Sequence, residues 1–229
     1  MDGNGRWAKR RHLPVLAGHR AGTQAVRRVI QAARDFGIRQ LTLFAFSTEN
    51  WKRPAEEVEG LMHLLAEMID SEVPDLHAHG CRVVFVGRRE NLSPELQSKM
   101  EAAERLTVGN QNMTLFIALN YGGRCEIVDA VRRAAAAGMD LRTISEEDIG
   151  RHLYSPLMRD PDLLIRTSGE KRLSNFLLWQ SAYTELFFSD LLWPDFDERE
   201  FARALADYAG RQRRFGARYD DGFDGRRSE

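Results

Sequence analysis

Two apolar stretches, Leu41-Thr42-Leu43-Phe44-Ala45-Phe46 and Met113-Thr114-Leu115-Phe116-Ile117-Ala118-Leu119, decide the fold class of this chain. Each is a short continuous run, which is typical of a strand buried on both faces of a sheet. Residues 83–86 and 163–165 have the same character. Strands alternating with helices predict an α/β fold, with an open, mostly parallel sheet flanked by helices on both faces.

Helical spacing of apolar residues fills the intervals between these strands. It predicts helices over residues 22–36, 56–79, 126–137 and 197–213, with further helix starts capped at Ser93 and Ser145. We expect Pro74 to kink or break the second of these helices. No linker or repeat divides the chain, so residues 1–229 form one predicted domain whose tail after about residue 216 is frayed.

The composition of the chain argues against proteins that bind nucleic acid or an anionic membrane through their overall charge. The chain holds 33 Lys and Arg against 34 Asp and Glu, a net charge of -1 that gives no overall field for nucleic acid or an anionic membrane. Any anion must therefore be bound locally. Two cysteines, Cys81 and Cys125, provide neither a disulfide framework nor a C-x-x-C pair, which favours a reducing cytosol. We expect a cytoplasmic protein with no transmembrane segment and no signal peptide.

Polar, arginine-containing segments follow three of the predicted strands, at residues 47–54, 120–124 and 166–175. Open parallel sheets bind ligands at the carboxyl ends of their strands, so we expect these segments to converge. Guanidinium forks and glycine turns both match phosphate oxygens. A single surface arginine is more often solvated or paired with a carboxylate, but the clustering favours a phosphate site. The arginines concerned are Arg6, Arg53, Arg124, Arg166 and Arg172.

The first residues, Gly3-Asn4-Gly5-Arg6-Trp7-Ala8, satisfy the dinucleotide pattern G-x-G-x-x-A. The match is weak because no acidic residue lies near Thr23, where a ribose partner is needed, and Asp2 would repel a pyrophosphate. A divalent cation on Asp2 removes that contradiction, and Mg²⁺ is the ion that combines one carboxylate with phosphates and water. Glu185 and Glu49 are candidate second carboxylates. The alternatives are a capping role for Asp2 and a plain surface acid at Glu185.

The chain resembles the cis-prenyltransferases, the family of bacterial undecaprenyl diphosphate synthase. The matching motifs are residues 2–8, 18–22, 46–51 with 53–54, 120–124, 165–170 with 172 and 174–176, and 193–196, in that order along nearly the whole chain. The resemblance implies sequential condensation of isopentenyl diphosphate with an allylic diphosphate such as farnesyl diphosphate. Each new double bond is cis, Mg²⁺ is required, and the undecaprenyl diphosphate product is a precursor of the lipid carrier for cell-wall synthesis.

Residue roles follow from the same resemblance. Asp2 matches the metal-binding catalytic carboxylate, Glu185 the second metal ligand, and Asn50 the residue assigned to proton removal. The allylic diphosphate pocket comprises Gly3, Asn4, Gly5, Arg6 and His19. The isopentenyl diphosphate pocket comprises Arg166, Arg172, Leu173 and Ser174. The region between them is lined or ordered by Trp7, Ser47, Thr48, Glu49, Trp51 and Arg53.

The growing hydrocarbon needs an apolar tunnel, because burying it is favourable by about 0.8 kcal/mol per methylene. We expect it beside the helix over 56–79, where an ordinary core face is the alternative. The predicted lining is Ala45, Leu61, Leu64, Leu65, Met68, Ile69 and Met113. A very long product also implies transient membrane contact for its release.

The sequence departs from the family in three places. Relatives carry an apolar strand before the aspartate, so a chain starting at Met1 has a truncated first strand, and we expect it to be less active than an extended form. Val15 stands where an arginine contacts the allylic phosphate, and Lys171 stands where a histidine is common. Arg214-Phe215-Gly216 resembles an element that crosses a homodimer.

Two other function classes are compatible with parts of the sequence. A non-catalytic subunit of such an enzyme would keep the fold and lose the acids, and the presence of Asp2, Asn50 and Glu185 argues against it. A dinucleotide-binding oxidoreductase is disfavoured by the absent ribose acid. Binding of a diphosphate rather than a dinucleotide discriminates between the classes.

Overall fold

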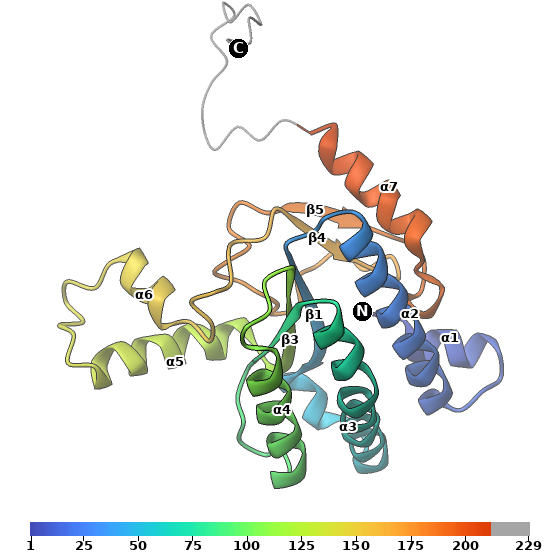
Figure 1. The fold of residues 1–229 in the computed structure, drawn as a ribbon, viewed down its shortest axis with the longest axis horizontal. Coiled ribbons are helices and arrows are strands. Elements are labelled where there is room, and N and C mark those ends of the chain that lie inside the picture. Colours follow the sequence, from blue (N-terminus) through green and yellow to red (C-terminus); the bar gives the residue numbers. More distant parts are fainter. Residues whose placement is uncertain (212–229) are drawn as a thin grey trace, which may run out of the picture.

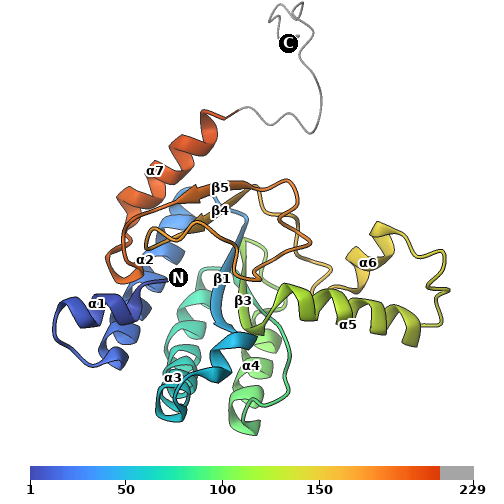
Figure 2. The same ribbon diagram turned by 180° about the vertical axis from the view of Figure 1, so that it is seen from behind.

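The computed structural model describes residues 1–211. Strands and helices alternate along the chain, as the apolar patterns predict (Figures 1 and 2). The elements are α1 (Asn4–Arg10), α2 (Val15–Asp35), β1 (Gln40–Ser47), the 3₁₀ helix η1 (Thr48–Lys52), α3 (Ala55–Ala78), β2 (Cys81–Val86), α4 (Pro94–Thr107), β3 (Met113–Tyr121), α5 (Gly123–Ala136), α6 (Glu146–His152), β4 (Leu163–Arg166), β5 (Glu185–Phe188), the 3₁₀ helix η2 (Trp193–Asp195) and α7 (Glu198–Ala209).

The strands form two parallel sheets, where one open sheet was predicted. The larger has the order β1-β3-β2, with Leu115 of β3 opposite both Leu41 and Val83. The smaller pairs β4 with β5, and Leu163 lies opposite Glu185. In residues 1–211 no strand joins β1 to β4, and a cavity separates them. Apolar runs identify strands, but pairing depends on which backbone edges meet, which the runs do not encode.

Alternate residues of β3 enter two different cores, as expected for a sheet covered on both faces. Leu115 and Leu119 belong to a large cluster with α2, α3, α4 and α7. Phe116 and Ala118 face a second cluster, which Phe176 and neighbouring residues cover. The prediction of an α/β fold with a parallel sheet flanked on both faces is confirmed.

Helix α3 continues through Pro74, which was expected to kink or break it. A helical proline removes one backbone hydrogen bond and crowds the preceding turn. Buried residues on both sides of it, Ile69, Val73 and Leu76, hold the helix against the sheet. Tertiary packing therefore outweighs the local cost. The capped starts at Ser93 and Ser145 are confirmed, since each side chain accepts a bond from the helix backbone.

Two glycines one turn apart on α2 allow α1 to pack closely against it. An ideal Cβ at Gly18 would lie 2.1 Å from the carbonyl oxygen of Asn4, and one at Gly22 would lie 2.5 Å from Asn4 Oδ1. Any side chain at either position would push the start of α1 away. The predicted motif at residues 18–22 thus places the first residues of the chain over α2. No helix within residues 1–211 is sufficiently long and apolar to cross a bilayer.

Candidate active site

The ends of β1, β3 and β4 converge, as predicted from their polar segments, and Asn175 connects them. Its Nδ2 donates to Glu49 Oε1 at 2.8 Å, after β1. Its Oδ1 accepts from the backbone N–H of Arg124 at 2.9 Å, and its carbonyl from that of Gly123 at 2.7 Å, after β3. Asn175 has φ 64°, a left-handed conformation that asparagine tolerates better than most residues. Residues 126 positions apart thereby share one polar wall.

Asp2 is fixed on β4 through both backbone and side chain. Its N–H donates to Thr167 Oγ1 at 2.9 Å, and Thr167 donates back to the Asp2 carbonyl at 2.9 Å. Arg166 donates to Asp2 Oδ2 from Nε at 2.9 Å and lies 2.8 Å from it through Nη2. Gly3, not Asp2, occupies the N-cap position of α1, and the Asp2 carboxylate pairs with Arg166 instead.

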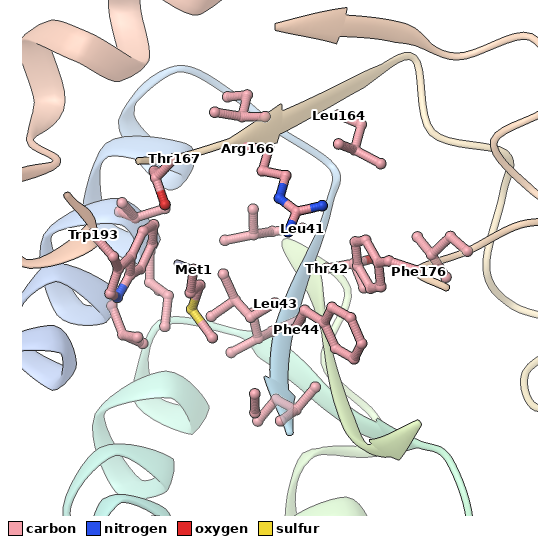
Figure 3. Close-up of a pocket in the computed structure, with 18 of the residues that line it drawn as sticks. Met1, Leu41, Thr42, Leu43, Phe44, Leu164, Arg166, Thr167, Phe176 and Trp193 are labelled. Carbon is pink, nitrogen blue, oxygen red and sulfur yellow. The ribbon is translucent and has the colours of Figure 1, made fainter. Parts of the chain in front are cut away.

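Arg166 is the most buried of the predicted phosphate-binding arginines. Its residue exposure is 9%, and it also donates to Ser174 Oγ at 2.8 Å and to the carbonyl of Arg172. A buried guanidinium with fixed hydrogen bonds is pre-organised for bidentate recognition of a phosphate. Figure 3 shows it reaching from β4 into the space beside β1. The structure thus brings together Asp2, Arg166 and Ser174.

Arg6 and Arg172 lie further out and share a carboxylate. Arg6 donates to the carbonyl of Ser168 at 3.2 Å and to its Oγ at 2.6 Å, and lies 2.9 Å from Glu170. Arg172 also contacts Glu170, and its hydrogen bond is the main cause that lowers the pKa of that carboxyl. Both arginine side chains are about half exposed, at 48% and 62%. They form the solvent side of the pocket.

His19, on α2, lies against a carboxylate that sequence analysis did not identify. His19 Nε2 lies 3.5 Å from Glu57 Oε1, and Arg53 Nη1 lies 3.1 Å from the same oxygen. Burial lowers the pKa of His19, and the Arg53 charge adds to that effect, while Glu57 opposes it. The four-residue spacing of Arg53 and Glu57 is the one signal in the sequence, since the contact between α2 and α3 is not local.

The η1 turn holds the next predicted residues. The backbone N–H of Ser47 donates to Asn50 Oδ1 at 3.0 Å, which leaves the second lone pair of that oxygen for another partner. Burial alone would raise the pKa of Glu49, but hydrogen bonds, first from Asn175, lower it below its usual value. Glu49 is therefore an ionised residue of the polar wall, held in place by Asn175, and its role as a metal ligand stays a prediction.

A cavity of 1570 Å³ extends from this polar wall between the two sheets and α2 and α3 (Figure 3). Its polar end contains most of the predicted site residues: Asp2, Asn4, His19, Ser47, Glu49, Asn50, Arg53, Arg166, Arg172, Leu173 and Ser174. Its apolar walls include the predicted Ala45, Leu61, Leu64, Leu65, Met68 and Ile69. Met113 was wrongly predicted to line it. Met113 pairs with Cys81 and is 2% exposed in the core, away from the cavity.

Six other predicted site residues do not line the cavity: Gly3, Gly5, Arg6, Trp7, Thr48 and Trp51. The indole N–H of Trp7 donates to Asp195 Oδ1 at 2.7 Å, and that of Trp51 to Asn120 Oδ1 at 2.8 Å. These tryptophans order the surrounding segments, as one of the predicted roles allowed. Val15 and Lys171, the two positions where the sequence differs from the family pattern, are both exposed.

The donor set at Asp2 fits a magnesium ion. Both bonds from Arg166 go to Oδ2, so Oδ1 faces away from that pair, and the side chain is 43% exposed. Mg²⁺ prefers one or two carboxylates with substrate phosphates and water completing its shell. Within residues 1–211 no group of three or more His, Cys, Asp or Glu side chains is placed to hold a metal ion.

Glu185, the predicted second ligand, is not brought to Asp2 within one chain. Asp2 bonds to Thr167 beyond the end of β4, whereas Glu185 starts β5 opposite Leu163. Four residues of strand separate these levels, a rise of about 13 Å. Glu185 Oε2 also forms an ion pair with Arg211 Nη1 at 2.8 Å. Its role as a metal ligand stays a prediction.

An arginine-containing polar end on an apolar cavity, built at the strand ends of an α/β fold, has the chemistry of a site for an amphiphilic phosphate ester. Comparison with known proteins agrees: a family model described as putative undecaprenyl diphosphate synthase matches residues 1–216, and the chain belongs to this prenyltransferase family, a family of cis-prenyltransferases.

Curated relatives are similar along nearly the whole chain. An isoprenyl transferase of Heliobacterium mobile is 52% identical, covering 94% of this chain and 85% of the relative. The ditrans,polycis-undecaprenyl-diphosphate synthase ((2E,6E)-farnesyl-diphosphate specific) of Escherichia coli is 49% identical, covering 94% and 87%.

Solved structures show the same fold. Lavandulyl diphosphate synthase from Lavandula x intermedia, in complex with dimethylallyl diphosphate, has a TM-score of 0.91 and 37% identity and covers 95% of both chains. A probable undecaprenyl diphosphate synthase from Campylobacter jejuni has a TM-score of 0.79 and 33% identity, covering 86% of this chain and 92% of that one.

Proposed function

We propose that this enzyme condenses isopentenyl diphosphate successively with farnesyl diphosphate or a similar allylic diphosphate, forming cis double bonds up to undecaprenyl diphosphate. The observation that carries the proposal is the Asp2–Arg166 pair, which stands at the polar end of a 1570 Å³ apolar cavity. The polar end matches two diphosphates and the apolar walls match a hydrocarbon that lengthens away from them. Such a product is the precursor of the lipid carrier for cell-wall synthesis.

The residues divide between the two substrates. Gly3, Asn4, Gly5, Arg6 and His19 bind the allylic diphosphate, and the α1 helix start presents its backbone N–H groups to it. Arg166, Arg172, Leu173 and Ser174 bind isopentenyl diphosphate. Trp7, Ser47, Thr48, Glu49, Trp51 and Arg53 shape the region between them.

Asp2 would hold Mg²⁺, with Glu185 as a separate, second ligand. The bound ion supplies charge neutralisation for the diphosphate that leaves the allylic carbon. The arginines stabilise the same developing charge. Asn50 Oδ1, with one lone pair unused by Ser47, would assist removal of the proton that isopentenyl diphosphate loses as the new carbon–carbon bond forms, and the released diphosphate would take up that proton.

We further propose a cytoplasmic homodimer that contacts the membrane transiently to release its product. The dimer element expected at Arg214-Phe215-Gly216 lies outside the described residues.

The test is incubation with labelled isopentenyl diphosphate, farnesyl diphosphate and Mg²⁺, followed by sizing of the products. Asp2→Ala should reduce turnover by at least about a thousandfold, as expected when a group acting on the leaving-group charge is removed. Titration calorimetry should show that the Asp2→Ala variant still binds isopentenyl diphosphate, the substrate assigned to Arg166. Binding of both substrates by the unaltered chain without any turnover would favour the non-catalytic subunit instead.

A further inference from the structure

Residues 9–16 comprise the last two residues of α1, the turn at 11–14 and the first two residues of α2. We call them the basic apolar loop, and they are exposed at every position. The loop begins with Lys9, Arg10, Arg11 and His12 and continues with Leu13, Pro14, Val15 and Leu16. Its large apolar side chains are 44%, 44% and 39% exposed at Leu13, Val15 and Leu16. Three exposed apolar residues so close together on a loop are unusual on a surface meant only for water.

The loop is a defined turn. The N–H of Leu13 donates to the Ala8 carbonyl at 3.0 Å, and that of Ala17 to the Pro14 carbonyl at 3.0 Å. His12 takes a left-handed φ of 56° between them. These bonds satisfy the backbone of the turn locally. Leu13, Val15 and Leu16 stay exposed, although Leu16 also approaches Gly60 of α3.

The chain segment around the loop carries charge of one sign, and in the described residues the one acid that pairs with the loop is Asp195, 3.5 Å from Arg11. Residues 3–34 contain eight Lys and Arg and no Asp or Glu, although the whole chain is nearly neutral. In the part of the chain that the structure describes, Lys9 and Arg10 take part in no ion pair. Other exposed arginines do, such as Arg105 with Glu101 and Arg142 with Asp140. The loop therefore presents unpaired positive charge beside exposed apolar side chains.

The loop lies at the end of the molecule where the diphosphates are expected. It leads from α1, which starts beside Asp2, into α2, which carries His19, and α1 lies at the periphery (Figures 1 and 2). Leu16 Cδ1 lies 3.1 Å from an ideal Cβ at Gly60, on α3, whose next residue lines the cavity. The surface is thus continuous with the helix that forms the apolar wall.

We propose that the basic apolar loop is a docking surface for a bilayer containing anionic phospholipids. Lys9 and Arg10 would lie among the phosphate headgroups, and Leu13 with its neighbours would enter the acyl boundary. Charge complementarity selects the anionic surface. The exposed leucines favour a lipid over a nucleic acid, since a polyanion in water gains nothing from them. Only the purpose of docking, release of a long-chain product, rests on the proposed function.

The test is sedimentation of the full chain, without substrates, with vesicles of phosphatidylcholine alone or mixed equally with phosphatidylglycerol. Each basic residue at an anionic surface strengthens binding by about fivefold, so Lys9→Gln with Arg10→Gln should weaken binding to the mixed vesicles by about thirtyfold. Leu13→Ser should weaken it by about fivefold. On vesicles of pure phosphatidylcholine, Leu13→Ser should lower the weak binding further, whereas the Lys9→Gln, Arg10→Gln variant should bind as the unaltered chain does.

Matched controls come from elsewhere on the surface. Arg105→Gln with Arg142→Gln removes the same charge, and Leu106→Ser removes an apolar side chain that is 49% exposed. Neither control should change vesicle binding by more than about twofold, and circular dichroism should show all variants folded. Equal losses in loop and control variants, or no preference of the unaltered chain for phosphatidylglycerol, would overturn the proposal.

Two further outcomes would replace the lipid surface with another partner. Binding to duplex DNA that is lost with Lys9 and Arg10 but unaffected by Leu13→Ser would identify a nucleic acid. A dimer in solution that dissociates in Leu13→Ser would identify a second copy. Prenyl transfer assayed in detergent separates this proposal from the proposed function, because the loop variants should keep full turnover there while losing vesicle binding.

Discussion

Gly18→Ala tests whether close packing of α1 on α2 builds the site. The added methyl carbon would lie 2.1 Å from the backbone oxygen of Asn4, 2.8 Å from its carbonyl carbon and 3.1 Å from Ala8 Cβ. Two of these contacts are with backbone, so α1 must shift as a unit. Overpacking of this kind costs about 1–3 kcal/mol.

The matched control is Gly150→Ala in α6, where a Cβ meets nothing within 4 Å. Both changes gain about 1 kcal/mol of helix propensity, so the difference between the two variants isolates the packing cost. The free energy of unfolding of Gly18→Ala, measured in urea, should be about 1–3 kcal/mol lower than that of Gly150→Ala. For a chain of this size this corresponds to a melting temperature about 5 °C lower.

The same shift should displace Asn4 and Arg6, so the KM for the allylic diphosphate should rise by about tenfold in Gly18→Ala and stay unchanged in Gly150→Ala. Steady-state kinetics at saturating isopentenyl diphosphate measures this. Equal stability and equal KM in the two variants would refute the role assigned to the close approach.

Three further changes test other parts of the site and fold. Glu57→Gln removes the charge beside His19, and the KM for the allylic diphosphate should rise about fivefold with little change in kcat; an unaltered KM would contradict the role of Glu57. Leu65→Trp fills part of the cavity, so products sized by chromatography should be shorter at unchanged stability, and full-length product would show that growth takes another path. The Arg88 hydrogen bond lowers the pKa of Asp129 to about 2, so its stabilisation is present above the ordinary value of 3.8 and lost as the pH falls through about 2. Asp129→Asn should therefore cost about 1–2 kcal/mol at neutral pH, with the difference vanishing in acid melts near pH 2, whereas a constant difference would exclude this linkage.

The sequence predicted those features that depend on local pattern. The runs at 41–46 and 113–119 identify β1 and β3 because a strand buried on both faces has to be apolar throughout. The polar segments after these strands identified the site because parallel strands end at one edge. Ser93 and Ser145 marked helix starts through a bond to a backbone three residues away.

Features that depend on contacts between distant elements were not predictable in this way. The gap between β1 and β4 reflects which strand edges meet, and both strands have the same apolar character. Met113 was misassigned because it lies on the same face of β3 as the lining residues Leu115 and Ile117 but at the start of the strand, where the core covers it. Glu57 was missed because its partner His19 belongs to another helix. The effect of Pro74 on the helix was overestimated because the cost of a helical proline is local, whereas the packing that offsets this cost comes from distant elements.

The polar end of the cavity is assembled from remote parts of the chain, and this has a consequence for folding. Asp2 meets Arg166 across 164 positions, and Glu49 meets Asn175 across 126. Contacts of such high sequence separation form late, after the entropy of closing long loops has been overcome. Partly folded intermediates should therefore lack the Asp2–Arg166 and Glu49–Asn175 contacts and bind substrate weakly. Ligand binding will therefore report complete folding, and substrates will stabilise only the finished molecule.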